Sequence, residues 1–355
     1  MALRPGDSQG NSWGARERDF QDPLCLLLLV LFLQEHEKYR QNLRKRNDYL
    51  QSPYILQSVY GDVMKKSIYA LGFFDGVHLG HQELLSRCVS LATEYGCSAA
   101  AITFDRHPKS LFTETPTVLI STVHDRVLLL KQYGMEAVHV LPVTKAVMDM
   151  PWQDFLQDLL DRGAAGFVCG DDFHFGRRGE GNAEKLTAFC REQGLPCCVV
   201  PEQTVGDIRI SSTYIRRQIE SGDMATAVKF LGHPYTLTGT VVHGKQLGRK
   251  LGIPTANLLL PYGLAIPRFG VYACRAIVDG VRYPAVTNIG TRPTVSGQGI
   301  TVEPWILDYQ GDLYDRDITL EFFRFLRSEQ KFPNLEALRE EIHRNAAETR
   351  NILKN

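Results

Sequence analysis

The sequence predicts an α/β domain followed by a small antiparallel β-barrel that a final helix closes. Between Ser67 and Gly222, apolar strand-like runs alternate with helical patterns, which is typical of a parallel sheet with helices on both faces. After Gly232, strand candidates follow one another with glycine or proline between most of them, which favours a barrel or a sandwich. A length of 355 residues suits two domains.

We expect four regions along the chain. Residues 1–66 form an atypical extension, 67–222 the α/β domain, 223–234 a linker and 235–355 the β domain. The extension contains a dense apolar run from Leu24 to Leu33. That run is too short to span a bilayer, which takes about 20 residues, and no small-residue cleavage site follows it.

The start of the chain has two interpretations. Met64 directly precedes the first predicted strand and suits the start of the protein. Our hypothesis is that most of residues 1–63 is an upstream extension assigned in error, or a disposable tail. The alternative is a short helix that associates with a membrane or with a partner.

Composition narrows the class of partner. The 40 Lys and Arg residues balance the 40 Asp and Glu residues, so nothing favours a nucleic-acid or anionic-membrane partner. None of the eight cysteines forms a C-x-x-C pair or a cluster with zinc spacing. We therefore expect reduced thiols, a cytoplasmic location, no membrane partner, and a monomer or a weak homo-oligomer.

Each element of the α/β domain follows from its pattern. The predicted strands are residues 67–71, 99–104, 137–141, 167–169 and 197–200, and residues 118–121 form a further short apolar run. The predicted helices run from His81 to a stop at Gly96, and over 122–133, 151–162, 182–193 and 211–220. Gly134, Gly163 and Gly194 end the next three, and Pro151 suits a first turn.

The β domain is predicted in the same way. Its strand candidates are residues 235–242, 271–278, 282–287, 301–307 and 318–323. The last helix, Asn334 to Leu353, carries one apolar stripe that consists of Leu335, Leu338, Ile342 and Ala346.

The most informative stretch runs from Gly72 to His81. A strand ends there, Asp75-Gly76 reads as a turn, and His78 and His81 fall at the start of a helix. Free backbone N–H groups and the positive end of the helix dipole make that position a phosphate site, and two imidazoles three residues apart can face one ligand. The alternative is a turn whose two histidines merely cap the helix.

Three further motifs follow strands of the same domain. Phe104–Pro108 places Asp105 and His107 at a strand end, where a site lip and a structural turn are equally good interpretations. The Gly170–Gly176 loop contains Asp172 and Phe173, and its aromatics can stack on a flat ring or anchor the loop. Ser211, Ser212, Thr213 and Arg216 lie at a helix start, where they suit a polyphosphate, or plain capping with a solvated arginine.

The second strong string is Gly244 to Asn257. Its glycines and cations make a basic loop that can approach phosphates closely, although it is not a Walker A loop. Thr255 and Asn257 alternate in an extended segment and offer hard oxygen ligands for Mg²⁺. The alternative is a glycine-rich barrel loop.

Glu303 stands inside an otherwise apolar strand. A buried carboxylate is costly without a partner, and a general base that accepts a hydroxyl proton would have a reason to be there. The alternative is an exposed strand position, and Glu321 and Asp308 are the substitutes if Glu303 is dispensable.

These strings resemble the bacterial bifunctional riboflavin kinase/FAD synthetase family. Phe74 to Gln82 contains the HxGH signature of the adenylyltransferase superfamily, residues 211–216 resemble its S-S-T-x-x-R loop, and residues 244–257 resemble the riboflavin kinase signature. The resemblance covers residues 67–353. It departs from the family pattern at Phe73, where Asn is more common, at Pro304, and at Asn345, where an acid is common.

The resemblance implies a Rossmann-like nucleotidyltransferase domain and a riboflavin kinase barrel that use ATP, Mg²⁺, riboflavin, FMN and FAD. It implies catalysis by His78 and His81 in the first domain. It implies ATP contacts there from Gly72, Phe73, Asp75, His78, His81, Ser211, Ser212, Thr213 and Arg216, and flavin or nucleotide contacts from Asp105, His107, Asp172 and Phe173. In the second domain it implies ATP contacts from Gly244, Gly248, Arg249, Gly252, Thr255 and Asn257, metal ligands in Thr255 and Asn257, catalysis by Glu303 and flavin contacts from Arg324 and Arg327. The rival functions are a lone adenylyltransferase that acts on another phosphate and carries a binding barrel, and a flavin-binding or regulatory protein with relict sites.

Overall fold

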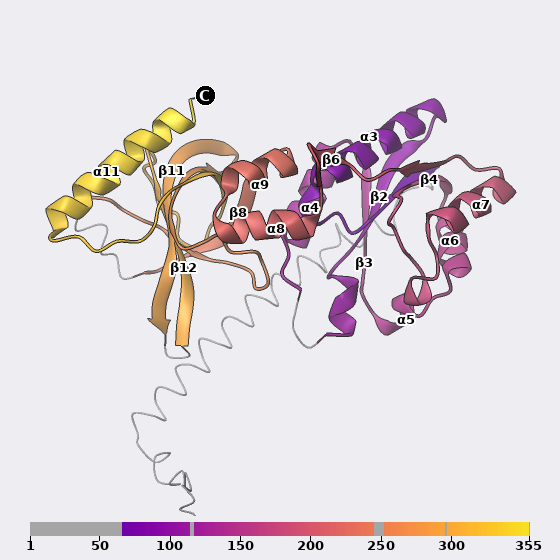
Figure 1. The fold of residues 1–355 in the computed structure, drawn as a ribbon, viewed down its shortest axis with the longest axis horizontal. Coiled ribbons are helices and arrows are strands. Elements are labelled where there is room, and N and C mark those ends of the chain that lie inside the picture. Colours follow the sequence, from indigo (N-terminus) through magenta and orange to yellow (C-terminus); the bar gives the residue numbers. More distant parts are fainter. Residues whose placement is uncertain (1–65, 114–116, 245–251, 295–296, 355) are drawn as a thin grey trace, which may run out of the picture. The chain divides into compact units, whose positions relative to one another are not determined.

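The computed structural model describes residues 66–113, 117–244, 252–294 and 297–354, and residues Gly61–Asn355 form one compact unit (Figure 1). The expectations for residues 1–65, including Cys25 and the start at Met64, lie outside the described residues. No helix within the described ranges is both long and apolar enough to cross a membrane.

The α/β part contains a five-stranded parallel sheet, as predicted. Its strands are β1 (Ser67–Leu71), β2 (Ser98–Phe104), β3 (Ala137–Leu141), β4 (Ala164–Gly170) and β5 (Cys197–Val200). They are ordered β3-β2-β1-β4-β5, and every neighbouring pair is parallel. The carboxyl end of β1 therefore lies in the middle of the sheet edge, where ligands bind in open α/β sheets.

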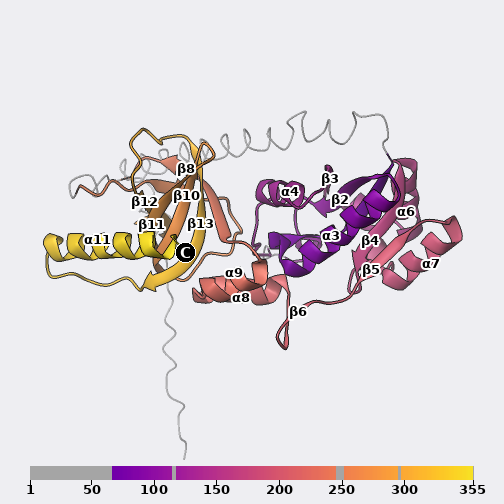
Figure 2. The same ribbon diagram turned by 90° about the horizontal axis from the view of Figure 1, so that it is seen from above.

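Helices cover both faces of this sheet (Figures 1 and 2). On one face, α3 (Leu79–Glu94) and α4 (Val123–Gln132) pack on the side chains of Ile68 and Ala70. On the other, α6 (Trp152–Asp161) and α7 (Ala183–Gln193) pack on Tyr69 and Leu71. The alternation along β1 divides one apolar strand between two cores, and each fully buried leucine contributes about 1.5–3 kcal/mol.

The remaining short elements of this part connect the strands. They are the turns η2 (Asp75–Val77), η3 (Pro108–Leu111) and η4 (Arg177–Gly179), helix α5 (Lys145–Met148), and the hairpin of β6 (Thr204–Val205) and β7 (Ile208–Arg209).

Two helices lead into the second part of the chain, and they lie side by side in Figures 1 and 2. They are α8 (Ser212–Ser221) and α9 (Met224–Leu231). Gly222 and Gly232 end them in the left-handed conformation that glycine adopts without strain. The segment that we expected to be a linker thus contains α9, whose Met224 and Phe230 pack into the core of the barrel.

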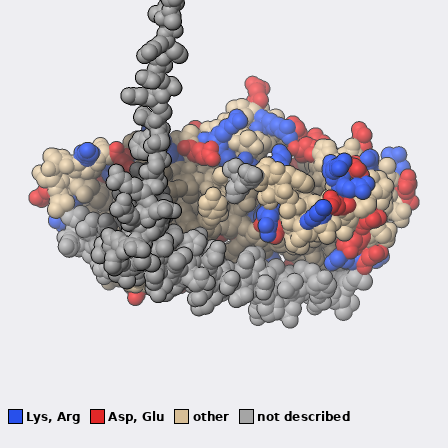
Figure 3. Space-filling view, turned by 90° about the horizontal axis from the view of Figure 1, so that it is seen from below, with Lys and Arg blue, Asp and Glu red and all other residues tan. Residues whose placement is uncertain are grey.

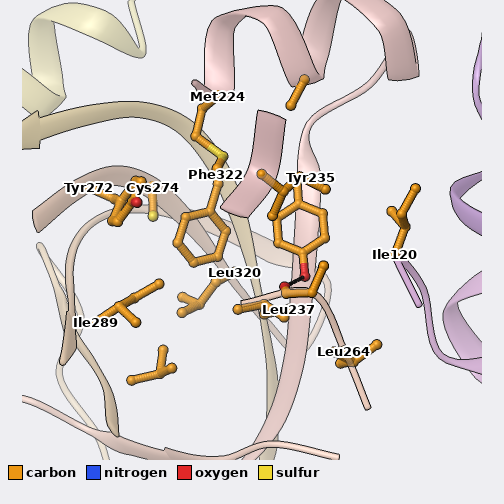
Figure 4. Packing of buried hydrophobic residues seen from close by; sticks show 14 of the residues in the cluster. Ile120, Met224, Tyr235, Leu237, Leu264, Tyr272, Cys274, Ile289, Leu320 and Phe322 are labelled. Atoms are coloured by element: carbon orange, nitrogen blue, oxygen red, sulfur yellow. Dashed lines mark hydrogen bonds between the residues drawn. The ribbon is translucent and has the colours of Figure 1, made fainter. Parts of the chain in front are cut away.

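The second part is a closed antiparallel barrel, as predicted. Its strands are β8 (Tyr235–Val242), β9 (Asn257–Leu259), β10 (Gly270–Val278), β11 (Val281–Thr294), β12 (Gly297–Ile306) and β13 (Asp317–Arg327), ordered β10-β11-β12-β9-β8-β13. Leu237, Tyr272 and Phe322 are among the residues that fill its interior (Figure 4).

Helix α11 (Leu335–Ile352) packs on the outside of this barrel, where Ala346 meets Val271 and Val286. The predicted stripe is wrong at its start, because Leu335 is 66% exposed. The helix buries Ala346, as predicted, together with Asn345 and Thr349, so its buried face includes two polar residues.

Candidate active sites

A strained turn follows β1 and places the histidine pair. Phe74, Gly76 and Val77 all have positive φ, which is uncommon for residues with a Cβ and marks a turn that its surroundings hold in place. His78 is the N-cap of α3, and its Nδ1 accepts a hydrogen bond of 3.3 Å from the backbone N–H of His81. This bond leaves the proton of the His78 ring on Nε2.

The two imidazoles are stacked, with centroids 3.6 Å apart and planes at 13°. Burial, with a smaller contribution from the nearby His233, lowers the pKa of His78 to about 4. Burial, His78 and Arg126 hold the pKa of His81 well below its usual value. Both rings are therefore neutral at pH 7, and Nδ1 of His81 is buried without a hydrogen-bond partner in the described part of the chain.

Asp75 holds this turn from inside the protein. Its carboxylate accepts hydrogen bonds from the backbone N–H of Ile120 at 2.9 Å and of Ser121 at 3.1 Å, and it lies 3.5 Å from Nε of Arg216. Burial raises its pKa, and Arg126, Arg216 and the two N–H groups oppose that rise. Ser212 donates to the Asp75 carbonyl at 3.0 Å, so Asp75 joins β1, the 120–121 segment and α8.

Arg126 is a functional candidate that the sequence analysis missed. It is fully buried on α4 and donates to the carbonyls of Phe73 at 2.9 Å and Phe104 at 3.0 Å. Its guanidinium lies 4.4 Å from the centre of the Phe73 ring, and its Nε has no hydrogen-bond partner among the described residues. A charge at helical spacing from the buried Leu130, on the face that should be apolar, was the available signal.

His107 lies beside the same cations. Its ring meets Phe73 edge-on at 4.9 Å, and its Nδ1 accepts from the backbone N–H of Lys109 at 3.1 Å. Burial lowers its pKa, and Lys109, Arg216 and Arg126 lower it further. The structure thus brings three histidines and two arginines together at the carboxyl ends of β1 and β2: the pair His78 and His81, His107, Arg126 and Arg216.

The other predicted residues of this part have structural contacts. Ser211 caps α8 by accepting from the backbone N–H of Tyr214 at 3.2 Å, and Thr213 is exposed. Asp105 accepts from the backbone N–H of Val143 at 2.8 Å, and Gly72 is buried against the Phe74 ring.

The 170–176 loop anchors itself with its aromatics. The ring of Phe173 is stacked on that of the buried Phe175, with centroids 5.7 Å apart. Asp172 is exposed and forms an ion pair of 2.7 Å with Arg209. These contacts match the interpretation of Phe173 as a loop anchor, and a ligand contact stays a prediction.

In the barrel, β9, β12 and β11 bring three polar side chains into one row. Val302 pairs with Leu258, so Glu303 comes opposite Asn257 one step along the antiparallel pair, and Glu303 also pairs with Asn288. Val302 and Leu258 point into the core, so Glu303 and Asn257 point outward. Cross-strand neighbours of this kind have Cβ atoms about 4.5–5.5 Å apart.

Asn257 also lies against Gly244, where an added Cβ would overlap the amide group. Ala256 packs toward the core, so the exposed Thr255 falls on the same outer side as Asn257, as expected. Gly252 is exposed, and Gly248 and Arg249 lie outside the described residues. Within the described ranges, no group of three or more His, Cys, Asp or Glu side chains is arranged to hold a metal ion.

The substitutes for Glu303 are already engaged with arginines. Glu321 lies 3.4 Å from Arg275, and Asp308 forms an ion pair with Arg350, which lowers the pKa of Asp308. Neither environment favours a general base.

Arg324 and Arg327 both lie on the outside of β13, but they differ in their contacts. Arg324 is exposed. Arg327 donates to the Asn345 side chain at 3.0 Å and lies 3.3 Å from Glu341, so it joins β13 to α11. Asn345, to which the sequence assigned no role, is therefore a buried partner of Arg327.

The surface charge is mixed. On the face shown in Figure 3, Lys and Arg side chains alternate with Asp and Glu over the coloured residues, which matches the zero formal net charge.

Comparisons with known proteins divide the chain in the same way as the sites do. A family model described as FAD synthetase matches residues 62–214, and one described as riboflavin kinase matches residues 231–353. A bifunctional riboflavin kinase/FMN adenylyltransferase of Listeria monocytogenes is 32% identical over 306 residues, with 85% of this chain and 96% of the relative covered. One of Bacillus subtilis is 34% identical, with 80% and 91% covered.

Among solved structures, a protein from Streptococcus pneumoniae titled a macrolide-efflux protein matches with a TM-score of 0.75 and 28% identity. The match covers 83% of this chain and 97% of that one, so both parts of the fold recur together.

Proposed function

This chain belongs to the family of bifunctional riboflavin kinase/FMN adenylyltransferases, and we propose that its two parts act in succession on one flavin. The barrel phosphorylates riboflavin to FMN, and the α/β part transfers an adenylyl group from ATP to FMN, which gives FAD and pyrophosphate. The observation that carries the residue assignment is the set of buried nitrogens on His81, Arg126 and Arg216 that lack hydrogen-bond partners at the carboxyl end of β1.

In adenylyl transfer, a phosphate oxygen of FMN forms a bond to the α-phosphorus of ATP, and the bond from that phosphorus to the β-phosphate oxygen breaks. The nucleophile is already an anion, so no strong base is needed, and the protein must position the groups and stabilise charge. His78 donates from Nε2, His81 from a free ring nitrogen, and Arg126 and Arg216 supply fixed positive charge. The arriving triphosphate raises the pKa of both imidazoles.

In the kinase reaction, the 5′-hydroxyl of riboflavin attacks the γ-phosphorus of ATP, and ADP leaves. We assign Glu303 as the general base that takes the hydroxyl proton, because it faces outward beside Asn257 and Asn288. We assign Arg324 and Arg327 to flavin binding. Arg327 would contact the flavin while it keeps its hydrogen bond to Asn345 on α11.

Mg²⁺ is assigned to Thr255 and Asn257. The hydroxyl and amide oxygens are hard ligands, and the missing Cβ at Gly244 leaves room for the Asn257 amide, so the residues fit an ion that ATP holds in part. The ion would neutralise charge on the transferring phosphates.

A reducing compartment suits the protein. All the cysteines in the described ranges are free thiols: four are buried (Cys88, Cys169, Cys190 and Cys274) and three are half-buried. We therefore propose a cytoplasmic enzyme. A monomer or a weak homo-oligomer remains our proposal for its assembly.

Incubating the purified protein with riboflavin, ATP and Mg²⁺, and then separating the flavins, tests this function. We expect FMN first and FAD later. Neither FMN nor FAD, together with adenylyl transfer from ATP to another phosphate compound, would support the lone adenylyltransferase. No product from either flavin, with binding retained, would support the flavin-binding protein.

A further inference from the structure

A residue from the start of the second part touches the catalytic turn of the first. His233 lies between α9 and β8, and its Nε2 is 3.0 Å from the carbonyl oxygen of Gly76, inside the turn that leads to His78. Its Nδ1 is 2.9 Å from the carbonyl oxygen of Pro234. Carbonyl oxygens only accept hydrogen bonds, so the ring nitrogen that faces Gly76 is the donor of that hydrogen bond.

The N–H and the carbonyl group of Gly76 are thus bound by two different parts of the chain, the α/β part and the start of the barrel part. Its N–H donates to Oγ of Ser121 at 3.1 Å, while its carbonyl faces His233. Gly76 has φ of 75°, and an added Cβ would overlap Ile120. Ile120 in turn belongs to the apolar cluster of the barrel and lies beside Leu264 and Tyr235 in Figure 4.

The neighbours of His233 follow the same path. Nε2 of Gln82 donates to the carbonyls of Val77 at 2.9 Å and Leu231 at 2.6 Å, so one side chain joins the turn to the end of α9. A Cβ at Gly232 would overlap the side chain of Leu79. Residues 231–233 therefore lie along the turn and the first residues of α3.

We propose that His233 is a positioning residue for adenylyl transfer: it holds the Gly76 carbonyl and thereby the strained turn that aims His78 and His81 at the triphosphate. The inference rests on the proposed function. His233 lies beyond residue 214, where the FAD synthetase match ends, so part of the adenylyl site comes from the chain that enters the barrel.

The test compares His233→Ala with His233→Gln, whose side-chain amide can donate from nearly the same place as Nε2. We measure kcat and KM for FAD formation from FMN, riboflavin phosphorylation by the same preparation, and the Tm. We expect His233→Ala to lower kcat for FAD about tenfold or more, with KM for FMN within about threefold and riboflavin phosphorylation within about twofold. His233→Gln should recover most of kcat.

Thr238→Val is the matched control. Oγ1 of Thr238 on β8 donates to Asp125 on α4 at 3.0 Å, so it also joins the two parts, but it does not touch the turn. We expect near-normal FAD formation from this variant.

Equal losses in Thr238→Val and His233→Ala, or unchanged kcat in His233→Ala, would overturn the assignment while the wild-type protein still makes FAD. If His233→Ala does not fold, a kcat for His233→Gln as low as that of an empty reaction would overturn it in its place. Absence of FAD with the wild-type protein would overturn the proposed function and this assignment together.

Discussion

Burial decides the protonation state of the two histidines in the proposed adenylyl site. His78 is only 7% exposed, so a proton on its ring would create a charge that little water can solvate. Two neutral imidazoles beside the buried Arg126 and the half-buried Arg216 can bind a polyanion without repelling each other as two imidazolium ions would. The charge that binds phosphate then comes from guanidinium groups, which stay protonated.

The low pKa of His78 predicts a loss of stability in mild acid. Between pH 6.5 and about 4, the unfolded His78 binds a proton that the folded ring does not, so the free energy of unfolding falls as the pH falls through this window. The shift corresponds to about 3 kcal/mol over the whole window. We expect His78→Gln to lose less Tm than the wild-type protein between pH 7 and pH 5, and equal losses in the two proteins would contradict the assignment.

Arg126→Lys should damage both the fold and FAD synthesis. An ammonium group cannot bond two carbonyls in the fork geometry of a guanidinium or stack on Phe73 in the same way. We expect the free energy of unfolding, from denaturant titration, to fall by about 1–3 kcal/mol, and FAD formation to fall about tenfold, with FMN formation retained.

Arg87→Lys is the control for that substitution. Arg87 forms an exposed i,i+4 ion pair with Glu83, so stability should change by less than about 0.5 kcal/mol. A loss of stability as large as that of Arg126→Lys would show that burial of the guanidinium is not the cause.

The difference between these two arginines is one that sequence alone does not reveal. The spacing of His78 and His81 after a strand and a glycine turn predicts their place at the N-terminus of α3, because that geometry is local. The partners of Arg126 are the carbonyls of Phe73 and Phe104, which lie 53 and 22 residues away. Only the packing of α4 on the sheet decides that this charge points inward.

Helices and strands were predictable where their patterns are local. The five sheet strands and the helices that flank them follow from alternating apolar runs and glycine stops. The short β9 was not predicted, because its form depends on pairing with β8 and β12. Helix α9 was not predicted either, although Asp223 caps its start and Gly232 ends it. The stripe of α11 was wrong at Leu335, because that side chain is exposed, whereas Glu341, His343 and Ala346 contact the strands.

Gly244→Ala tests whether the position of Asn257 on β9 matters for the proposed kinase site, because Gly244, just after β8, lies against the Asn257 amide. The new methyl group would overlap the Asn257 amide and displace it from its place beside Glu303. We expect riboflavin phosphorylation to fall about tenfold or more, while FAD formation from added FMN stays within about twofold of the wild-type rate. Unchanged phosphorylation would remove Asn257 from the kinase site.

In the whole molecule, the two sites use different elements. The adenylyl site that we propose lies at the ends of β1 and β2 and the starts of α3 and α8, and the kinase site that we propose lies on β9, β11 and β12. FMN is the product of one site and the substrate of the other. The two activities should therefore be separable by single substitutions, even though His233 and Ile120 join the two parts.

Four reactions test this separation: His81→Ala and Glu303→Gln, each supplied with riboflavin or with FMN in the presence of ATP and Mg²⁺, with the flavins separated afterwards. We expect His81→Ala to convert riboflavin to FMN and to stop there, and Glu303→Gln to leave riboflavin unchanged but to convert FMN to FAD. FAD from His81→Ala at the wild-type rate, FMN from Glu303→Gln, or the loss of both conversions in either variant with a normal Tm would contradict two sites that act in succession.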